Sequence, residues 1–273
     1  MKILRVFPRR TNASPDDNDV RFSVPSLFDV ADLVHISVTF TYDLTYADYL
    51  YNQWKHVAPT IIGGPAVGDP PGTFVPGQYL KHGYVITSRG CNNSCWFCYA
   101  WKREGKIKEL PIVTGWNILD NNLLACSENH IKSVFSMLKK QPQKPCFTGG
   151  LEAKYITHSI ASQLYDLRPS RLYFAYDTPD DLEPLQEAGF ILKSVGFGKS
   201  HDLMCYALCG FPGDTFNNAL TRFKSIISAG FMPYSMLYRN DKGVYDPSWI
   251  PFNSQWCNPV KCASNMKKLN IKE

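Results

Sequence analysis

The sequence lacks any long hydrophobic run. No apolar stretch approaches the roughly 18 residues that a membrane-spanning helix needs, and Met1 is followed by a segment rich in Lys and Arg rather than by the apolar core of a secretion signal. The nine cysteines are odd in number, which argues against a disulfide framework. We therefore expect a soluble protein of the reducing cytoplasm with no part in a membrane.

The chain also lacks a large excess of positive or negative charge. The formal net charge is only +5, and this small excess does not indicate a nucleic-acid-binding surface. Charged residues make up 19% of the chain and aromatic residues 14%, a composition that builds a sizeable core and argues against disorder.

Three cysteines stand close together without a fourth. Cys91, Cys95 and Cys98 follow a strand-like run and have the spacing C-x3-C-x2-C. Three thiolates on one tight loop can bind three irons of a cubane [4Fe-4S] cluster, and Gly90 gives the backbone room to turn. Because no fourth thiolate lies beside them, one iron stays open to a small molecule. The sequence therefore predicts a reactive metal centre on this loop.

Two other interpretations of these thiols are weaker. A zinc site would need a fourth ligand at short spacing, and His82 lies on the wrong side of the preceding strand. Three inert buried cysteines would not be interrupted by Asn92, Asn93 and Ser94, which are typical of exposed turns.

The loop Cys91-Asn-Asn-Ser-Cys-Trp-Phe-Cys98 resembles the cluster-binding loop of radical S-adenosylmethionine (radical SAM) enzymes. In that family the open iron binds the amino and carboxylate groups of S-adenosylmethionine (SAM). The reduced cluster then cleaves the sulfonium, and the resulting 5'-deoxyadenosyl radical abstracts hydrogen from a substrate. The resemblance implies that Phe97 lies near the adenine and that an electron donor such as flavodoxin or ferredoxin is a partner.

From residue 84 onward, strand-like and helix-like stretches alternate, which favours an α/β fold with a parallel sheet. Thr178 is a natural N-cap with Pro179 at the first helical position, and Gly189 is expected to end that helix. The predicted strands cover residues 84–87, 112–119, 145–148, 171–177, 203–209 and 232–238, and the predicted helices 128–139, 157–167, 178–189 and 216–227.

Six such units with right-handed crossovers would wind into a closed or partly closed barrel. This agrees with the partial (β/α)6 barrel that the radical SAM resemblance implies, here over residues 79–240. Loops at the carboxyl ends of parallel strands converge on one mouth. We therefore expect one cavity bordered by Cys91–Cys98, Asp120, Gly149, Asp177 and Gly210.

Two segments are candidates for binding the SAM amine. Radical SAM proteins commonly have Gly-Gly-Glu at the end of the second strand, and here Asp120-Asn121-Asn122 holds that place, with side chains able to accept ammonium hydrogens. The literal glycine pair, Gly149-Gly150 with Glu152, follows one strand later. Either segment alone is also explained by ordinary turn chemistry.

Two further positions border the expected mouth. Gly210-Phe-Pro-Gly-Asp-Thr215 is similar to a Gly-Phe-Pro-Gly-Glu-Thr stretch common in the superfamily, although it also fits a plain turn with Asp214 as N-cap. Arg239 follows the sixth strand, where it could bind the SAM carboxylate or an anionic substrate, or equally be a surface arginine.

Residues 1–78 have a different character. A strand over 33–40, a helix over 43–55 and a strand over 60–65 indicate a small, truncated Rossmann-like α/β unit, followed by a Gly/Pro-rich linker over 64–76. Its Ile-Ile-Gly-Gly-Pro ending resembles the close of the cobalamin-binding domain in the B12-dependent branch of radical SAM enzymes. The Asp-x-His-x-x-Gly pattern of the axial histidine is missing, so bound cobalamin is not expected.

Residues 241–273 form a C-terminal extension in which prolines argue against a long helix. Cys257 and Cys262 could join an auxiliary cluster with Cys205 or Cys209, although two thiols at this spacing more often have no such role.

The sequence thus predicts a radical SAM enzyme. The alternatives are a non-catalytic iron-sulfur or zinc-binding protein and a cobalamin-dependent methyltransferase, which would copurify with a coloured corrinoid.

Overall fold

The computed structural model describes residues 1–68, 77–198 and 202–268. The chain folds into two compact units: unit 1 comprises Met1–Tyr84 and Asp241–Gly243, and unit 2 comprises Val85–Asn240 and Val244–Glu273. Residues 69–76 of the expected linker lie outside the described residues.

Unit 1 is built on a four-stranded parallel sheet with the strand order β2-β1-β3-β4. Helix α1 (Leu44–Trp54) lies within the helix predicted over 43–55, connects β3 to β4 and buries Ala47, Leu50 and Trp54 on one face. The strands are β1 (Ile3–Val6), β2 (Val20–Arg21), β3 (Leu33–Ser37) and β4 (Thr60–Gly63). The sequence predicted β3 and β4 but not the two strands before them.

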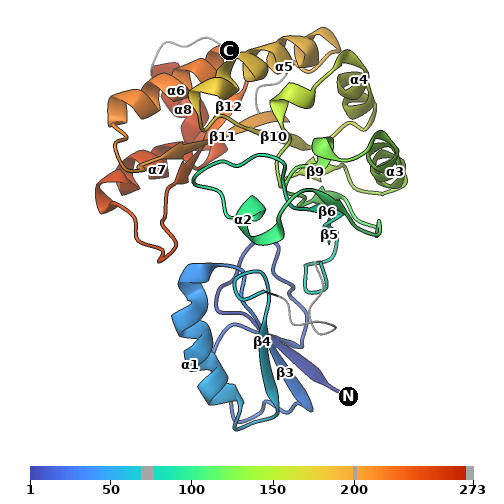
Figure 1. Cartoon of the computed structure of the whole chain (residues 1–273), viewed down its shortest axis with the longest axis vertical. Helices are drawn as coiled ribbons and strands as arrows, with labels where there is room; N and C mark the ends of the chain where they lie inside the picture. The colour runs from blue at the N-terminus through green and yellow to red at the C-terminus, as the bar shows by residue number, and fades with distance from the viewer. Residues whose placement is uncertain (69–76, 199–201, 269–273) are drawn as a thin grey trace. The chain divides into compact units, whose positions relative to one another are not determined.

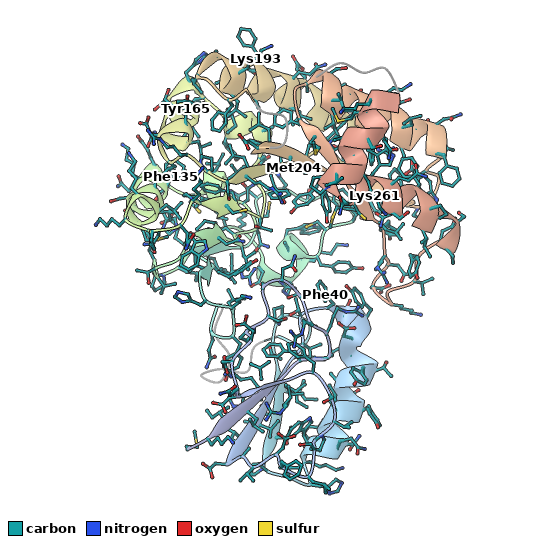
Figure 2. The ribbon with its side chains drawn as sticks, turned by 180° about the vertical axis from the view of Figure 1, so that it is seen from behind. Phe40, Phe135, Tyr165, Lys193, Met204 and Lys261 are labelled. Carbon is teal, nitrogen blue, oxygen red and sulfur yellow. The ribbon has the colours of Figure 1, made fainter. Side chains whose placement is uncertain are left out.

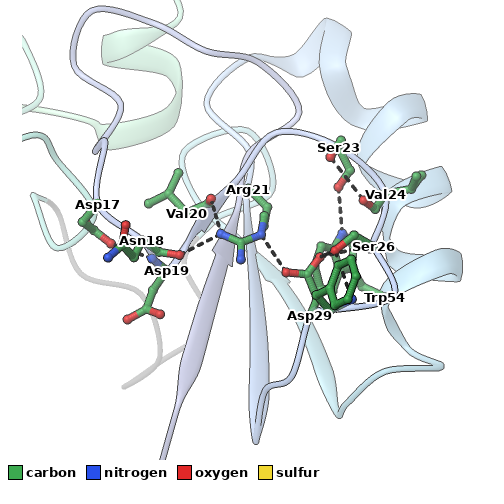
Figure 3. A network of polar contacts seen from close by, with 11 residues as sticks. Asp17, Asn18, Asp19, Val20, Arg21, Ser23, Val24, Ser26, Asp29 and Trp54 are labelled. Atoms are coloured by element: carbon green, nitrogen blue, oxygen red, sulfur yellow. Dashed lines mark hydrogen bonds and ion pairs between the residues drawn. The ribbon is translucent and has the colours of Figure 1, made fainter.

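A polar network holds the segment between β2 and β3 (Figure 3). The Arg21 guanidinium forms an ion pair with Asp29 at 2.8 Å and donates to the carbonyl oxygens of Asn18 and Val20. The indole of Trp54 donates to the carbonyl oxygen of Ser23 at 3.0 Å, which ties the same segment to the end of α1.

Unit 2 contains a six-stranded sheet with the order β12-β11-β10-β9-β8-β5, so neighbouring strands follow the order of the sequence. All pairs from β8 to β12 are parallel. The strands are β5 (Tyr84–Val85), β8 (Asn117–Ile118), β9 (Cys146–Phe147), β10 (Arg171–Ala175), β11 (Leu203–Cys209) and β12 (Met232–Leu237). The sheet is open, with β12 and β5 at its edges, and no closed barrel forms within the described residues.

Four helices follow one another in an arc around the outside of this sheet (Figure 1). They are α3 (Glu128–Lys139), α4 (His158–Asp166), α5 (Leu182–Ser194) and α6 (Phe216–Ser228). Ser127, Thr157 and Thr215 cap α3, α4 and α6 by accepting a backbone N–H three residues further on. Met204 lies fully buried in the interior of this unit, whereas Lys193 stands at its periphery (Figure 2).

Two sequence predictions about this unit were wrong. The strand expected over 112–119 is limited to Asn117–Ile118, where Asn117 pairs with Cys146 of β9. Helix α5 does not end at Gly189 but runs to Ser194. Gly189 instead permits a close approach, since a Cβ there would lie 2.0 Å from the carbonyl oxygen of Ala229.

The C-terminal extension forms two short helices, α7 (Ile250–Trp256) and α8 (Pro259–Lys268), both packed against β12. The Cys262 thiol is fully buried and lies 3.3 Å from the carbonyl oxygens of Pro233 and Trp256, either of which its single S–H can reach. Cys205 is also fully buried, within the main core. In the described part of the chain, no helix combines the length and the apolarity needed to cross a membrane.

Candidate functional site: a three-cysteine loop over the sheet

The three cysteines lie on a loop that a short antiparallel hairpin holds at its base. Strand β6 (Ser88–Arg89) pairs with β7 (Lys108–Glu109), and the loop between them contains α2 (Ala100–Glu104). The Cys91 N–H donates to the carbonyl oxygen of Gly105 at 3.1 Å. Gly90 has φ +84°, and a Cβ there would lie 2.2 Å from the carbonyl oxygen of Lys106, so this position requires glycine.

Hydrogen bonds inside the loop fix its second half. The Cys98 N–H donates to the carbonyl oxygen of Cys95 at 3.1 Å, and the Trp101 indole donates to the same oxygen at 2.8 Å. The Lys102 ammonium donates to the carbonyl oxygen of Trp96 at 3.2 Å. The positions of Cys95 and Cys98 are therefore set by backbone and side-chain bonds within the loop.

All three cysteines line one cavity of about 390 Å³. Of the other residues that the sequence predicted, the structure brings Phe97, Asn121, Gly149, Gly150, Glu152 and Asp177 to the same cavity. Asn122 of the candidate segment 120–122 also lines it. The cavity further includes residues that no sequence motif indicated, among them Asn93, Lys154, Asp181 and Tyr206. The cavity thus gathers the carboxyl ends of β8, β9 and β10 beside the cysteine loop.

Asp120 is not part of the cavity lining, and the structure gives it a different role from the one expected. Its carboxylate is 1% exposed and accepts hydrogen bonds from the Thr87 N–H at 2.6 Å, the Thr87 hydroxyl at 2.6 Å and the Ser88 hydroxyl at 2.8 Å. Both oxygens are thereby used inside the protein. Asp120 fastens the strand that leads into the cysteine loop.

Gly210 and Arg239 also lie outside the cavity lining. Gly210 has φ +74°, and its N–H donates to Asp214 at 3.0 Å, so the segment forms a plain turn. The expected N-cap was wrong, because Thr215 and not Asp214 caps α6. A Cβ there would lie 2.8 Å from the Trp249 ring. Arg239 is exposed, and its guanidinium lies 4.3 Å from the centre of the Tyr245 ring.

The two candidate amine-binding segments meet in one network. The Asn122 amide donates to the Glu152 carboxylate, and the Asn93 amide donates to the other Glu152 oxygen at 2.8 Å. Lys154 forms an ion pair with Glu152 and donates to the Asn93 side chain at 3.1 Å. Asn122 therefore joins the end of β8 to the loop after β9, on one wall of the cavity.

Asn122 also carries an unsatisfied acceptor. The residue is 3% exposed, and its Oδ1 has no hydrogen-bond partner among the described residues. Since Glu152 can only accept when ionised, the Asn122 Nδ2 must face it, which leaves Oδ1 on the other side. A buried acceptor beside a cavity is a natural partner for a donor on a ligand.

Burial shifts the pKa of two groups that line the cavity, the Asp177 carboxyl and the Cys95 thiol. Burial raises the pKa of the Asp177 carboxyl to about 7, aided by the neighbouring Asp181, although the Leu208 N–H bond at 2.8 Å opposes this shift. Burial likewise raises the pKa of the Cys95 thiol to about 11, and the nearby Cys98 and Asp181 add to the effect. A bound cation at this place would favour the ionised forms of both groups.

Among the described residues, no group of three His, Cys, Asp or Glu side chains is arranged to hold a single metal ion. A tetrahedral zinc site requires sulfurs about 3.8 Å apart, from Zn–S bonds of about 2.3 Å. In a four-iron cluster each thiolate binds a different iron, so the thiolates stand farther apart.

No protein-family model matches the chain, and no curated protein matches it.

Proposed function

We propose that the protein is a radical SAM enzyme that binds a [4Fe-4S] cluster through Cys91, Cys95 and Cys98 and cleaves SAM reductively. One observation carries this proposal: the three thiols of one short loop line a single cavity beside the carboxyl ends of parallel strands. The donor set fits the cluster, because it supplies three thiolates and leaves the fourth iron for a ligand in the same cavity.

The topology of unit 2 supports the partial (β/α)6 barrel that the proposal includes. Its strands stand side by side in sequence order, and four of the connections between them contain a helix on the outside of the sheet. Such a sheet curves around its inner face without needing to close.

The cavity also offers groups that suit SAM. Its volume of about 390 Å³ lies within the range of small-molecule sites. The unsatisfied Oδ1 of Asn122 would accept from the SAM ammonium, and Phe97 would provide an apolar wall for the adenine. Asp177, held through one oxygen by the Leu208 N–H, would offer its other oxygen to a ribose hydroxyl.

When bound, the cluster would supply the electron that cleaves the sulfonium of SAM to methionine and a 5'-deoxyadenosyl radical. The residues of this chain would hold the two cofactors in contact and exclude water. A low-potential one-electron donor such as flavodoxin or ferredoxin would be the partner.

The test begins with anaerobic reconstitution. Protein mixed with iron and sulfide should take up four of each per chain, and with SAM and dithionite it should release 5'-deoxyadenosine. Cys95→Ala should lose the cluster and the product. Cys126→Ala is the matched control, because Cys126 is half-buried but does not line the cavity.

The outcomes separate the alternatives. A fully loaded cluster without 5'-deoxyadenosine would leave a non-catalytic iron-sulfur protein, and tight zinc binding in place of iron would leave a zinc protein. Iron content that is unchanged by Cys95→Ala would refute the proposed cluster site.

A further inference from the structure

Cys91 differs from the other two cysteines in the hydrogen bonds that its sulfur accepts. The backbone N–H of Asn93 lies 3.5 Å from Cys91 Sγ, and the side-chain Nδ2 of Asn122 lies 3.6 Å from it. Within the described residues, neither Cys95 nor Cys98 has such a donor at its sulfur. The two donors have different origins, since one belongs to the loop itself and the other to the end of β8.

The orientation of the Asn122 amide is fixed by its surroundings. Its Nδ2 donates to both Cys91 Sγ and the Glu152 carboxylate, so a flipped amide would place Oδ1 against two acceptors. Asn122 is 3% exposed, and it leads directly into the turn η2 (Leu123–Ala125), where Leu123 is fully buried. The donor is therefore held in place before any cofactor binds.

We propose that Asn122 is a positioning residue that places an N–H donor on the Cys91 thiolate and thereby raises the reduction potential of the cluster. This inference rests on the proposed function. Reduction transfers one electron from an external low-potential donor to the irons, with no bond made and no proton needed. The thiolate sulfurs then carry more negative charge, and a fixed N–H dipole stabilises that state more than the oxidised one.

Nearby charges give the Asn122 contact particular importance. Glu152 would place a negative charge near the same sulfur, but it is paired with Lys154 and accepts from the Asn93 and Asn122 amides. The Asn122 amide nitrogen thus donates to both the Glu152 carboxylate and the Cys91 sulfur. Its loss would remove the dipole from the sulfur and leave the carboxylate with one bond fewer.

The experiment is a potentiometric titration of the reconstituted protein without SAM, followed by electron paramagnetic resonance of the reduced cluster. Asn122→Leu should retain its iron and sulfide, and the equilibrium constant for reduction should fall about tenfold, which corresponds to a midpoint about 59 mV lower. Asn93→Ala is the matched control: its side chain also contacts Glu152, but its bond to Cys91 comes from the backbone and persists. Its midpoint should stay at the wild-type value.

Equal midpoints in fully loaded Asn122→Leu and wild type would overturn the inference while leaving the proposed function intact. A wild-type protein that binds no cluster would instead refute the proposed function.

A second measurement does not depend on how Asn122→Leu folds. Two nitrogens face Cys91 Sγ, the backbone nitrogen of residue 93 and the Nδ2 of Asn122. In the Asn93→Ala protein labelled with ¹⁵N-asparagine, residue 93 is an unlabelled alanine, so Asn122 carries the label of this pair. The reduced cluster should then show a ¹⁵N hyperfine coupling. Absence of that coupling would also overturn the inference.

Discussion

Replacing Asp120 with alanine tests whether this carboxylate supports the cysteine loop or binds a cofactor. Three buried donors point at it: the Thr87 N–H, the Thr87 hydroxyl and the Ser88 hydroxyl, and both residues are fully buried. A buried donor left without an acceptor costs about 1–3 kcal/mol. Because the hydroxyls can rotate and the backbone N–H cannot, we expect a local loss of about 3 kcal/mol in total.

Hydrogen exchange measured by mass spectrometry reports this loss directly at the strand before Cys91. A loss of about 3 kcal/mol corresponds to a roughly hundredfold faster exchange of the Thr87 amide. Asp120→Asn keeps one acceptor oxygen for this N–H and should fall between Asp120→Ala and wild type. Asp180→Ala is the matched control, because Asp180 is an exposed carboxylate on the same cavity and its removal should change stability by less than about 0.5 kcal/mol.

The opposite pattern would refute the reasoning. If Asp120→Ala exchanged at the wild-type rate and yet weakened SAM binding, the carboxylate would act as a cofactor ligand, as the sequence alone suggested. Equal effects of Asp120→Ala and Asp180→Ala on exchange would mean that the three hydrogen bonds do not hold the strand.

Three further predictions concern the rest of unit 2. Gly189→Ala should destabilise the protein by about 1–3 kcal/mol, because its Cβ would meet the Ala229 carbonyl oxygen. Gly198→Ala is the control, since a Cβ there would have no atom within 4 Å. Equal thermal unfolding midpoints for the two variants would contradict this prediction. Burial raises the pKa of Asp177 to about 7 from an unfolded value near 4, so the folded state holds a proton that the unfolded state has lost, and stability should fall as pH rises from about 4 to 7. Asp177→Asn should reduce the pH dependence of stability in the cluster-free protein. If the thermal unfolding midpoint changed with pH as steeply as in the wild type, Asp177 would not be the group that titrates. Cys262→Ala should lower stability by about 1 kcal/mol without changing iron content, since its thiol is buried against backbone carbonyls; a loss of iron would instead support an auxiliary cluster.

Helices with a one-sided apolar pattern and a cap residue were predictable from the sequence. Helix α3 has the predicted bounds, Glu128–Lys139, because Ser127 caps its start and Ile131, Val134, Phe135 and Leu138 all face the core. Strand β11 also has its predicted bounds, Leu203–Cys209. In these cases the local pattern and the tertiary packing favour the same structure.

Tertiary contacts decided the features that the sequence did not predict. A glycine such as Gly189 is typical of a helix end, but here it lies inside α5. The neighbouring chain at Ala229 leaves no room for a side chain at this position. The pattern over 112–119 is strand-like, but only Asn117 and Ile118 form a strand, since Asn117 is the residue of this segment that pairs with β9. The direction of the Asp120 carboxylate depends on Thr87, a residue 33 positions away, which no local pattern specifies.

The sequence offered Asp120-Asn121-Asn122 and Gly149-Gly150 with Glu152 as two candidate segments for binding the SAM amine. In the structure these two segments are in contact with each other. A Cβ on Gly149 would lie 2.2 Å from the carbonyl oxygen of Asp120, so a bare glycine is what allows the loop after β9 to touch the loop after β8. That contact brings Glu152 within reach of the Asn122 amide. A side chain at residue 149 would push the two loops apart and separate Asn122 from Glu152. Gly149→Ala should therefore disturb the network around Cys91 even though residue 149 itself makes no bond to a thiol, and a cluster potential equal to that of the wild type in this variant would show that the two loops act independently.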